Sequence, residues 1–351
     1  MAPDAALAAR ARLDRLWTRG RAFLGCEVAI MGGAMSWVSE RHLVSAISNA
    51  GGFGVIACGS MGPALLEAEI AATQALTLRP FGVNLITMHP QLDDLVQVCA
   101  ASGVTHVVLA GGLPPASAVR AIKDAAKLVC FAPALALAKR LVRSGADALV
   151  IEGSEAGGHI GAVSLTVLAQ EILPHLREVP VFVAGGLGRG EAILSFLEMG
   201  ASGAQLGTRF AASAESIAHD RFKAAFVRAA ARDALPSTQL DARFPVIPVR
   251  GLANAGSRHF LEHQAETIRR FNAGELTREA AQLGIEHFWA GALRRAVVDG
   301  DVDEGSVMAG QSVGMVKSVQ PAAVVIAELV EQAVAALTLR AQEIRAQETT
   351  D

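Results

Sequence analysis

The sequence predicts an α/β protein built on a (β/α)8 barrel, with a smaller, mainly helical second domain. Over residues 1–210, short apolar runs of strand type alternate with longer amphipathic segments of helical type. Several helical segments end on a glycine just before the next strand, which is a common helix C-cap; these glycines are Gly51, Gly103, Gly145 and Gly200. Eight strand–helix units in about 180 residues require a parallel sheet with right-handed crossovers, and this repeat number favours a barrel over a doubly wound sheet.

The expected strands are short and almost entirely apolar. They are Val28–Met31, Phe53–Ala57, Phe81–Ile86, His106–Ala110, Leu128–Phe131, Ala148–Ile151, Val181–Ala184 and Gly203–Leu206. The expected helices are Glu40–Asn49, Pro63–Leu76, Gln91–Ser102, Pro115–Ala125, Ala134–Ser144, Leu165–Leu176 and Glu191–Met199.

The composition is that of a protein with a large buried core. Of its 351 residues, 52% are hydrophobic and 19% are charged, and the net charge of −3 predicts neither a nucleic-acid surface nor an anionic-membrane surface. Four scattered cysteines (Cys26, Cys58, Cys99 and Cys130), no signal-peptide pattern and no uncharged membrane-spanning run lead us to expect a cytoplasmic protein. Because tyrosine is absent, a mechanism with a tyrosine acid is excluded.

The strand–helix alternation stops after the barrel, so we expect residues 1–210 to form the barrel, residues 211–319 a substrate or lid domain, and residues 320–351 a helix that packs back on the barrel. Residues 299–306 look like a calcium loop but lack EF-hand spacing, and no metal site is expected. The small residues of 307–311 are expected to pack against the ligand side of the barrel. The expected elements are helices at Ala212–Ala231, which opens with Ser213, and at Arg258–Asn272, Thr277–Leu283, Phe288–Val297 and Ala322–Ala346, with a β-prone run at Phe244–Val249.

The loop after the sixth strand carries the most informative residues. Gly157 and Gly158 remove the side chains that would keep backbone away from a flat ligand, and His159 has a side chain suited to proton transfer near neutral pH. The alternative is a glycine-rich loop with a solvated histidine. In a barrel, chemistry lies at the carboxyl ends of the strands, which places this loop among the candidates.

The loops after the last two strands predict a phosphate site. Gly185, Gly186 and Gly207 offer backbone N–H groups beside a helix N-terminus, and the Thr208 hydroxyl would complete an anion cradle. The alternative is two unrelated tight turns. No GxGxxG motif follows the first strand, which argues against a dinucleotide fold.

Several motifs together resemble one family. They are Met35 with Trp37, residues 49–54 (NAGGFG), 79–84 (RPFGVN), 155–161 (EAGGHIG), 184–186 (AGG) and 205–210 (QLGTRF). This set, spanning about Ala29 to Val316, resembles the nitronate monooxygenase (2-nitropropane dioxygenase) family of FMN-dependent barrels, which includes the flavin-dependent type II enoyl-acyl-carrier-protein reductase. Ala29 and Gly32 depart from it, because the family usually has Pro and Gln around the first strand end.

The resemblance implies bound FMN, with His159 as the catalytic group at the reactive face of the flavin. The phosphate would lie on the glycine loops, the ring between Met35, Asn84 and the Gly157 backbone, and Glu152 and Gln205 would bond the ribityl chain or hold its neighbours. The expected cofactor-binding residues are Gly33, Met35, Asn84, Glu152, Gly157, Gly158, Gly185, Gly186, Gln205, Gly207 and Thr208.

The resemblance implies oxidation of an alkyl nitronate with O2. The alternative is an NAD(P)H-dependent reductase of an enoyl thioester (or a quinone), and a phosphate-binding barrel without redox chemistry is a third reading. The expected partners are therefore a small-molecule substrate with O2 or NAD(P)H, and a homodimer is compatible with the sequence. Four arginines that could dock an acidic carrier protein look too scattered to form a patch; they are Arg209, Arg243, Arg250 and Arg258.

Overall fold

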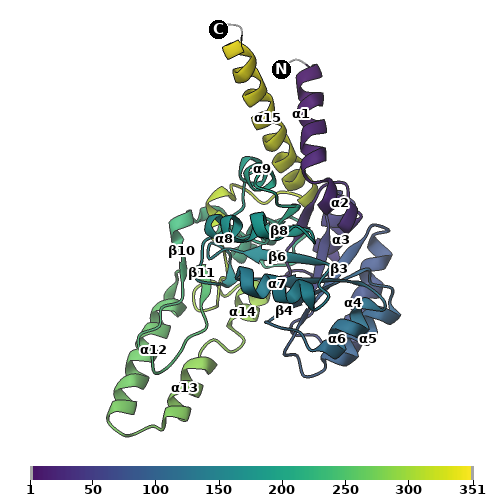
Figure 1. The fold of residues 1–351 in the computed structure, drawn as a ribbon. Helices are drawn as coiled ribbons and strands as arrows, with labels where there is room; N and C mark the ends of the chain where they lie inside the picture. Colours follow the sequence, from purple (N-terminus) through teal and green to yellow (C-terminus); the bar gives the residue numbers. More distant parts are fainter. Residues whose placement is uncertain (1–2, 349–351) are drawn as a thin grey trace.

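The protein is a parallel eight-stranded barrel surrounded by helices, as predicted (Figure 1). The computed structural model describes residues 3–348. The strands lie in the order β1-β9-β8-β6-β5-β4-β3-β2, and a parallel bridge between Met31 and Phe53 joins the two ends of the sheet. Their bounds are β1 Ile30–Gly32, β2 Gly54–Ala57, β3 Phe81–Ile86, β4 His106–Ala110, β5 Lys127–Phe131, β6 Ala148–Glu152, β8 Val181–Ala184 and β9 Gly203–Leu206.

The helices between the strands begin and end within a few residues of their predicted limits. Helix α3 starts after Glu40 because the Glu40 carboxylate accepts hydrogen bonds from the backbone N–H groups of His42 and Leu43. Helix α3 packs directly on β2 at Gly54, which has no side chain to keep them apart. A Cβ atom at this position would lie 2.3 Å from the Val44 carbonyl oxygen. The barrel helices are α3 Arg41–Asn49, α4 Pro63–Leu76, α5 Leu92–Ala101, α6 Ala116–Lys123, α7 Leu135–Arg143, α8 Leu165–Ile172, which continues into the 3-10 turn η1 Leu173–His175, and α9 Gly190–Glu198.

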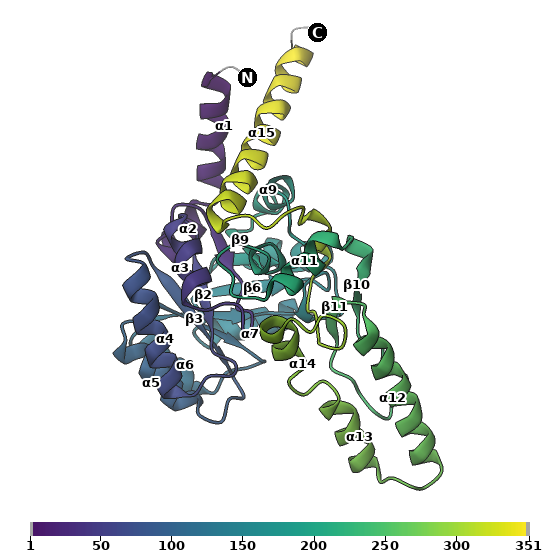
Figure 2. The same cartoon turned by 180° about the vertical axis from the view of Figure 1, so that it is seen from behind.

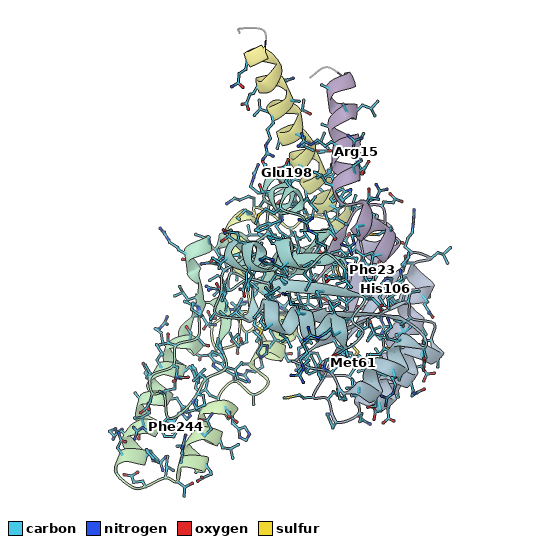
Figure 3. The ribbon with its side chains drawn as sticks, in the orientation of Figure 1. Arg15, Phe23, Met61, His106, Glu198 and Phe244 are labelled. Atoms are coloured by element: carbon cyan, nitrogen blue, oxygen red, sulfur yellow. The ribbon has the colours of Figure 1, made fainter. Side chains whose placement is uncertain are left out.

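Two helices precede the barrel and were not predicted, namely α1 Pro3–Leu16 and α2 Thr18–Leu24. Helix α1 runs beside the C-terminal helix α15 Ala322–Glu348, and the two project together from the barrel (Figures 1 and 2). Glu198 on α9 (labelled in Figure 3) links both helices to the barrel. Its carboxylate forms ion pairs with Arg12 of α1 at 3.2 Å and with Arg340 of α15 at 2.6 Å.

Helix α15 is the one helix in residues 3–348 that is long and apolar enough to cross a membrane. The stretch is Ala322–Glu343, with a mean hydropathy of 1.8, and 44% of it is buried inside the protein. It contacts α9, α1, α3 and α10 (Thr208–Ala211), so its buried part packs against other helices of this protein.

The region after the barrel differs from the prediction at several elements. The helix expected over 212–231 is wrong at its start: α10 Thr208–Ala211 is a single turn, and α11 Asp220–Arg228 begins only after His219, whose ring accepts from the Arg221 N–H. The β-prone run 244–249 is also wrong, because the strand is β11 Val249–Leu252. It lies between β10 Ala234–Pro236 and β7 Gly158–His159 in an antiparallel sheet.

Two further helices form a projecting hairpin, α12 Ala255–Asn272 and α13 Arg278–His287 (Figure 2). It has a small apolar core of its own, made by Phe244, Phe260, Ala281 and Ile285. The chain then returns to the barrel through α14 Ala292–Arg294 and a π-helical turn, η3 Arg295–Asp299, where one helix had been expected over 288–297. A last 3-10 turn, η4 Gln311–Met315, precedes α15.

Candidate active site

A cavity of about 600 Å3 opens at the carboxyl ends of the barrel strands. All of the residues that the sequence nominated for the site lie in its wall, although they come from the ends of five different barrel strands. They are Gly33, Met35, Asn84, Glu152, Gly157, Gly158, His159, Gly185, Gly186, Gln205, Gly207 and Thr208. The barrel geometry explains this convergence, because parallel strands bring their carboxyl ends to one face.

His159 is held by the small antiparallel sheet rather than by a free loop. Strand β7 pairs with β11, with His159 opposite Val249, and the next residue continues the ladder as the Ile160 N–H donates to the Pro248 carbonyl at 3.0 Å. The imidazole is exposed at the cavity wall, and no side chain in residues 3–348 bonds to it. The backbone is therefore fixed while the ring remains available to a substrate.

The β6–β7 loop packs tightly against the segment before η4. A Cβ atom at Gly157 would lie 2.5 Å from the backbone nitrogen of Gly310, so no side chain fits there. The Gln311 N–H donates to the Glu155 carbonyl at 2.9 Å, and the Gly310 N–H donates to the Thr208 hydroxyl oxygen at 2.9 Å. This segment thus joins the loops after β6 and β9 on one side of the cavity.

The proposed anion cradle has backbone that only glycine adopts easily. Gly185 and Gly186 have φ values of +96° and +71°, and a Cβ atom at Gly186 would lie 2.9 Å from the Glu155 Cβ. Thr208 begins α10, and its hydroxyl, which accepts from Gly310, keeps its own proton for a ligand. Glycines with positive φ beside a hydroxyl donor are features found in loops that bind phosphate groups.

Polar side chains form part of the cavity wall at the strand ends. Glu152 and Gln205 lie at the same level, because each is in register with Ala184 on the strand between them. Neither side chain has a hydrogen-bond partner in the part of the chain that the structure describes, whereas the Asn84 amide donates to the Val108 carbonyl at 3.1 Å. Burial raises the pKa of Glu152 from its ordinary value to about 7.

Residues of the second region complete the wall, and sequence reasoning did not find most of them. Met308 and Gly310 belong to the segment expected to pack on the barrel, but five other members were missed: Ala211, directly after the predicted barrel, and four that lie in segments with no recognisable motif. Those four are Phe222, Leu293, Val297 and Ser312.

A strained tryptophan stands beside this wall. Trp37, in the β1–α3 loop, has a φ of +68°, a conformation that bulky side chains rarely adopt. The Arg294 guanidinium of α14 lies 5.8 Å from the centre of its ring, a cation–π contact between the barrel and the returning segment. The sequence gives no sign of this contact.

Two groups of residues that the sequence singled out lie outside the cavity wall. Ala29 and Gly32, the departures from the family pattern, do not line the cavity, and a side chain at Gly32 would point toward Ile47 of α3. Arg209 and Arg250 are buried and cannot dock a carrier protein. Arg209 bonds the Gly188 and Met315 carbonyls and Glu328, and Arg250 bonds the Ser154 and Ala234 carbonyls.

The site can be compared with known proteins. A dehydrogenase of (3aS,4S,5R,7aS)-5-hydroxy-7a-methyl-1-oxo-octahydro-1H-indene-4-carboxyl-CoA from Mycobacterium tuberculosis is 30% identical over 86% of this chain and 91% of its own. A probable nitronate monooxygenase from Staphylococcus saprophyticus is 27% identical over 81% of this chain and 94% of its own. FabK (enoyl-ACP reductase II) from Thermotoga maritima superposes with a TM-score of 0.82 at 33% identity, covering 94% of this chain and 98% of its own.

The family model for nitronate monooxygenase matches residues 18–332, from α2 to the middle of α15. The match covers the barrel, the β7–β11–β10 sheet and the helical hairpin, and therefore every residue of the cavity wall. The chain belongs to the nitronate monooxygenase family, a family of oxidoreductases.

Proposed function

We propose that this protein is an FMN-dependent oxidoreductase that oxidises alkyl nitronates with O2. One observation carries the proposal: a histidine with a free imidazole and a glycine cradle suited to a phosphate line the same cavity. An anion cradle alone would fit many phosphate ligands. The combination with a proton-transfer group and with the family's oxidoreductase chemistry supports a flavin mononucleotide.

The volume of the cavity supports the proposal that it holds one cofactor. Its volume of about 600 Å3 is within the ordinary range for a single ligand site. Gly185, Gly186 and Gly207 would hold the phosphate with Thr208, and Glu152 with Gln205 would meet polar atoms of the chain that links phosphate and ring. Bound FMN would supply the electron transfer, while the protein orients the reactants.

His159 would act on the substrate. Its ring is exposed, so it can hold the negatively charged nitro group of a nitronate when protonated and take or give a proton when neutral. Phe222, Leu293 and Val297 give the same cavity an apolar side, which suits a short alkyl chain. A small apolar substrate beside the cofactor is therefore the simplest occupant.

A second candidate is a reductase or dehydrogenase of a thioester. Two similar proteins bear names of this kind, the carboxyl-CoA dehydrogenase at 30% identity and FabK at 33% identity. The same acid–base histidine would then serve an acyl substrate, with NAD(P)H in place of O2 as co-substrate. This candidate shares FMN, His159 and the cradle with the first. It differs in that NAD(P)H would reduce the flavin in place of the nitronate, and the enoyl thioester would reoxidise it in place of O2.

An anaerobic mixing experiment separates the two. The FMN-loaded protein is mixed with an alkyl nitronate, with NADH or with NADPH, and the flavin absorbance is followed. The proposal expects rapid bleaching by the nitronate, oxygen consumption when air is admitted, and little oxidation of NAD(P)H alone. Rapid bleaching by NAD(P)H, followed by reoxidation with an enoyl thioester, would overturn it in favour of the second candidate. A protein that takes up no FMN would contradict both.

A further inference from the structure

Glu152 is the only carboxylic acid in the cavity wall within residues 3–348. It is the last residue of β6, and its register partner Ala184 has too small a side chain to shield it. Among the described residues, no donor or cation reaches its carboxyl group, and the side chain of its neighbour in the same layer, Gln205, also has no hydrogen-bond partner there. A carboxyl that meets only the cavity is poised for a ligand.

The strands beside Glu152 offer it no cation. On β5, Lys127 donates to the Phe23 carbonyl at the start of the strand, and burial raises the pKa of Cys130 to about 12, so its thiol stays neutral. Strand β8, Val181–Ala184, carries no titratable side chain.

The loop after β6 and helix α8 also place no positive charge beside the Glu152 carboxylate. Glu155 accepts from the Leu165 N–H at 3.0 Å, Arg250 bonds carbonyl groups, and Glu171 of α8 is exposed. His159 is the other titratable group of the cavity wall. Burial with no nearby cation raises the pKa of Glu152 to about 7, so the protonated and ionised forms of its carboxyl are both populated near neutral pH.

A bound flavin phosphate would further favour the protonated form of Glu152. A phosphate group carries about two negative charges near neutral pH, and a second anion in the same poorly solvated cavity is unfavourable. A neutral carboxyl is a hydrogen-bond donor, whereas a carboxylate only accepts. We propose that Glu152 holds the cofactor as the uncharged acid, donating its carboxyl proton to an acceptor on the ligand, so that binding takes up a proton from solvent above neutral pH. This inference rests on the proposal that the ligand is FMN.

The sign of the effect follows from linkage. Below neutral pH the carboxyl already carries its proton, so the affinity for the cofactor does not change with pH through this group. At higher pH the proton must be taken up on binding, so the dissociation constant rises by up to about tenfold per pH unit. Glutamine at the same position can donate without titrating, and Glu152→Gln should therefore remove the rise while preserving the affinity found at low pH.

The test is a binding measurement that needs no turnover. The dissociation constant of FMN is measured by quenching of flavin fluorescence, between about pH 6 and pH 9, for the apoprotein, Glu152→Gln and Glu171→Gln. Glu171→Gln, which changes an exposed carboxyl on α8, is expected to follow the unaltered protein. Riboflavin serves as a second probe, because it has no phosphate whose own titration could contribute.

For both probes, the dissociation constant is expected to rise with pH in the unaltered protein and in Glu171→Gln. In Glu152→Gln the dissociation constant is expected to stay constant over the same pH range. An infrared carbonyl band of a protonated carboxyl, present in the apoprotein and lost in Glu152→Gln, would support it independently. A Glu152→Gln profile that still rises, or a uniform loss of affinity in that variant, would overturn the inference while leaving the FMN proposal intact. Failure of every protein to bind FMN would instead overturn the proposed function, and this inference with it.

Discussion

The Nε2 atom of His106 lies 2.9 Å from the carbonyl oxygen of Phe23, at the amino end of the barrel (Figure 3). The other ring nitrogen lies 2.8 Å from the Thr105 hydroxyl, and the ring meets Phe23 and Phe53 edge to face. A neutral imidazole satisfies both bonds by donating from Nε2 and accepting at Nδ1. His106 thus fastens α2 to the start of β4, on the side of the barrel away from the cavity.

The first prediction is that the fold loses stability in acid through His106. Burial lowers the pKa of His106 from 6.5 to about 4, so as the pH falls below 6.5 the unfolded chain gains a proton that the folded chain resists. The stability contributed by the neutral ring is complete above pH 6.5 and is lost progressively down to about pH 4, with a total of about 3 kcal/mol.

Chemical denaturation at several pH values checks this. His106→Gln should be less stable than the unaltered protein at neutral pH by about 1–3 kcal/mol, because the packing and one bond are lost, but should show less dependence on pH. The exposed His175 is the matched control, and His175→Gln should behave as the unaltered protein does. If the free energy of unfolding of His106→Gln depended on pH as it does in the unaltered protein, the loss of stability in acid would belong to other groups.

The sequence predicted the barrel strands because each is short, apolar and buried on both faces, a pattern that local composition reveals. It did not reveal β7, because Gly158–His159 becomes a strand only by pairing with β11, about ninety residues later. It also misplaced the helix after the barrel, because the Ala214 N–H bonds the Gln320 carbonyl and not an adjacent turn. Non-local hydrogen bonds decide both cases.

The candidate site was predictable to the extent that it is made of strand ends. The barrel rule places Asn84, Glu152 and Gln205 on one face without any knowledge of their contacts. Leu293 and Val297, which follow the α12–α13 hairpin, could not be found in this way. No local sequence pattern indicates where the chain contacts the barrel again after that hairpin. The left-handed backbone of Trp37 likewise depends on tertiary packing.

The second prediction concerns the phosphate cradle at Gly207. Its φ of −104° suits any residue, and a Cβ atom there would lie 3.5 Å from the Met35 sulfur, an ordinary contact. Gly207→Asp should therefore fold normally but weaken FMN binding by about tenfold or more, because a carboxylate would face the phosphate. Gly207→Ala is the steric control and should keep most of the affinity.

Raising the salt concentration should narrow the difference between Gly207→Asp and Gly207→Ala, because screening weakens the repulsion. Equal FMN affinity of the two variants at low salt would place the phosphate elsewhere. Gly186 is a poorer probe, since its φ is +71° and any side chain there would meet Glu155.

The third prediction is that His159→Ala binds FMN normally and loses turnover. The imidazole bonds no other side chain within residues 3–348, so its removal should leave the folding stability nearly unchanged. A general acid–base group contributes roughly 10²–10⁴-fold to the rate, and kcat should fall by that factor. Steady-state assays with the substrate that reduces the flavin, together with FMN titration, measure both quantities. A kcat near that of the unaltered protein would make His159 a structural residue of β7.

The fourth prediction uses two glycines that flank His159. Gly157→Ala should destabilise the fold by about 1–3 kcal/mol, because its Cβ would lie 2.5 Å from the Gly310 nitrogen and 2.7 Å from the Ala309 carbonyl carbon, and backbone must move. The displaced segment also holds Thr208, so FMN affinity should fall as well. Gly161→Ala is the matched control, since nothing lies within 4 Å of its added carbon. Thermal melts and FMN titrations measure the melting temperature and the FMN affinity of both variants. Equal values for Gly157→Ala and Gly161→Ala would show that the contact between the β6–β7 loop and residues 309–310 does not maintain the shape of the cavity.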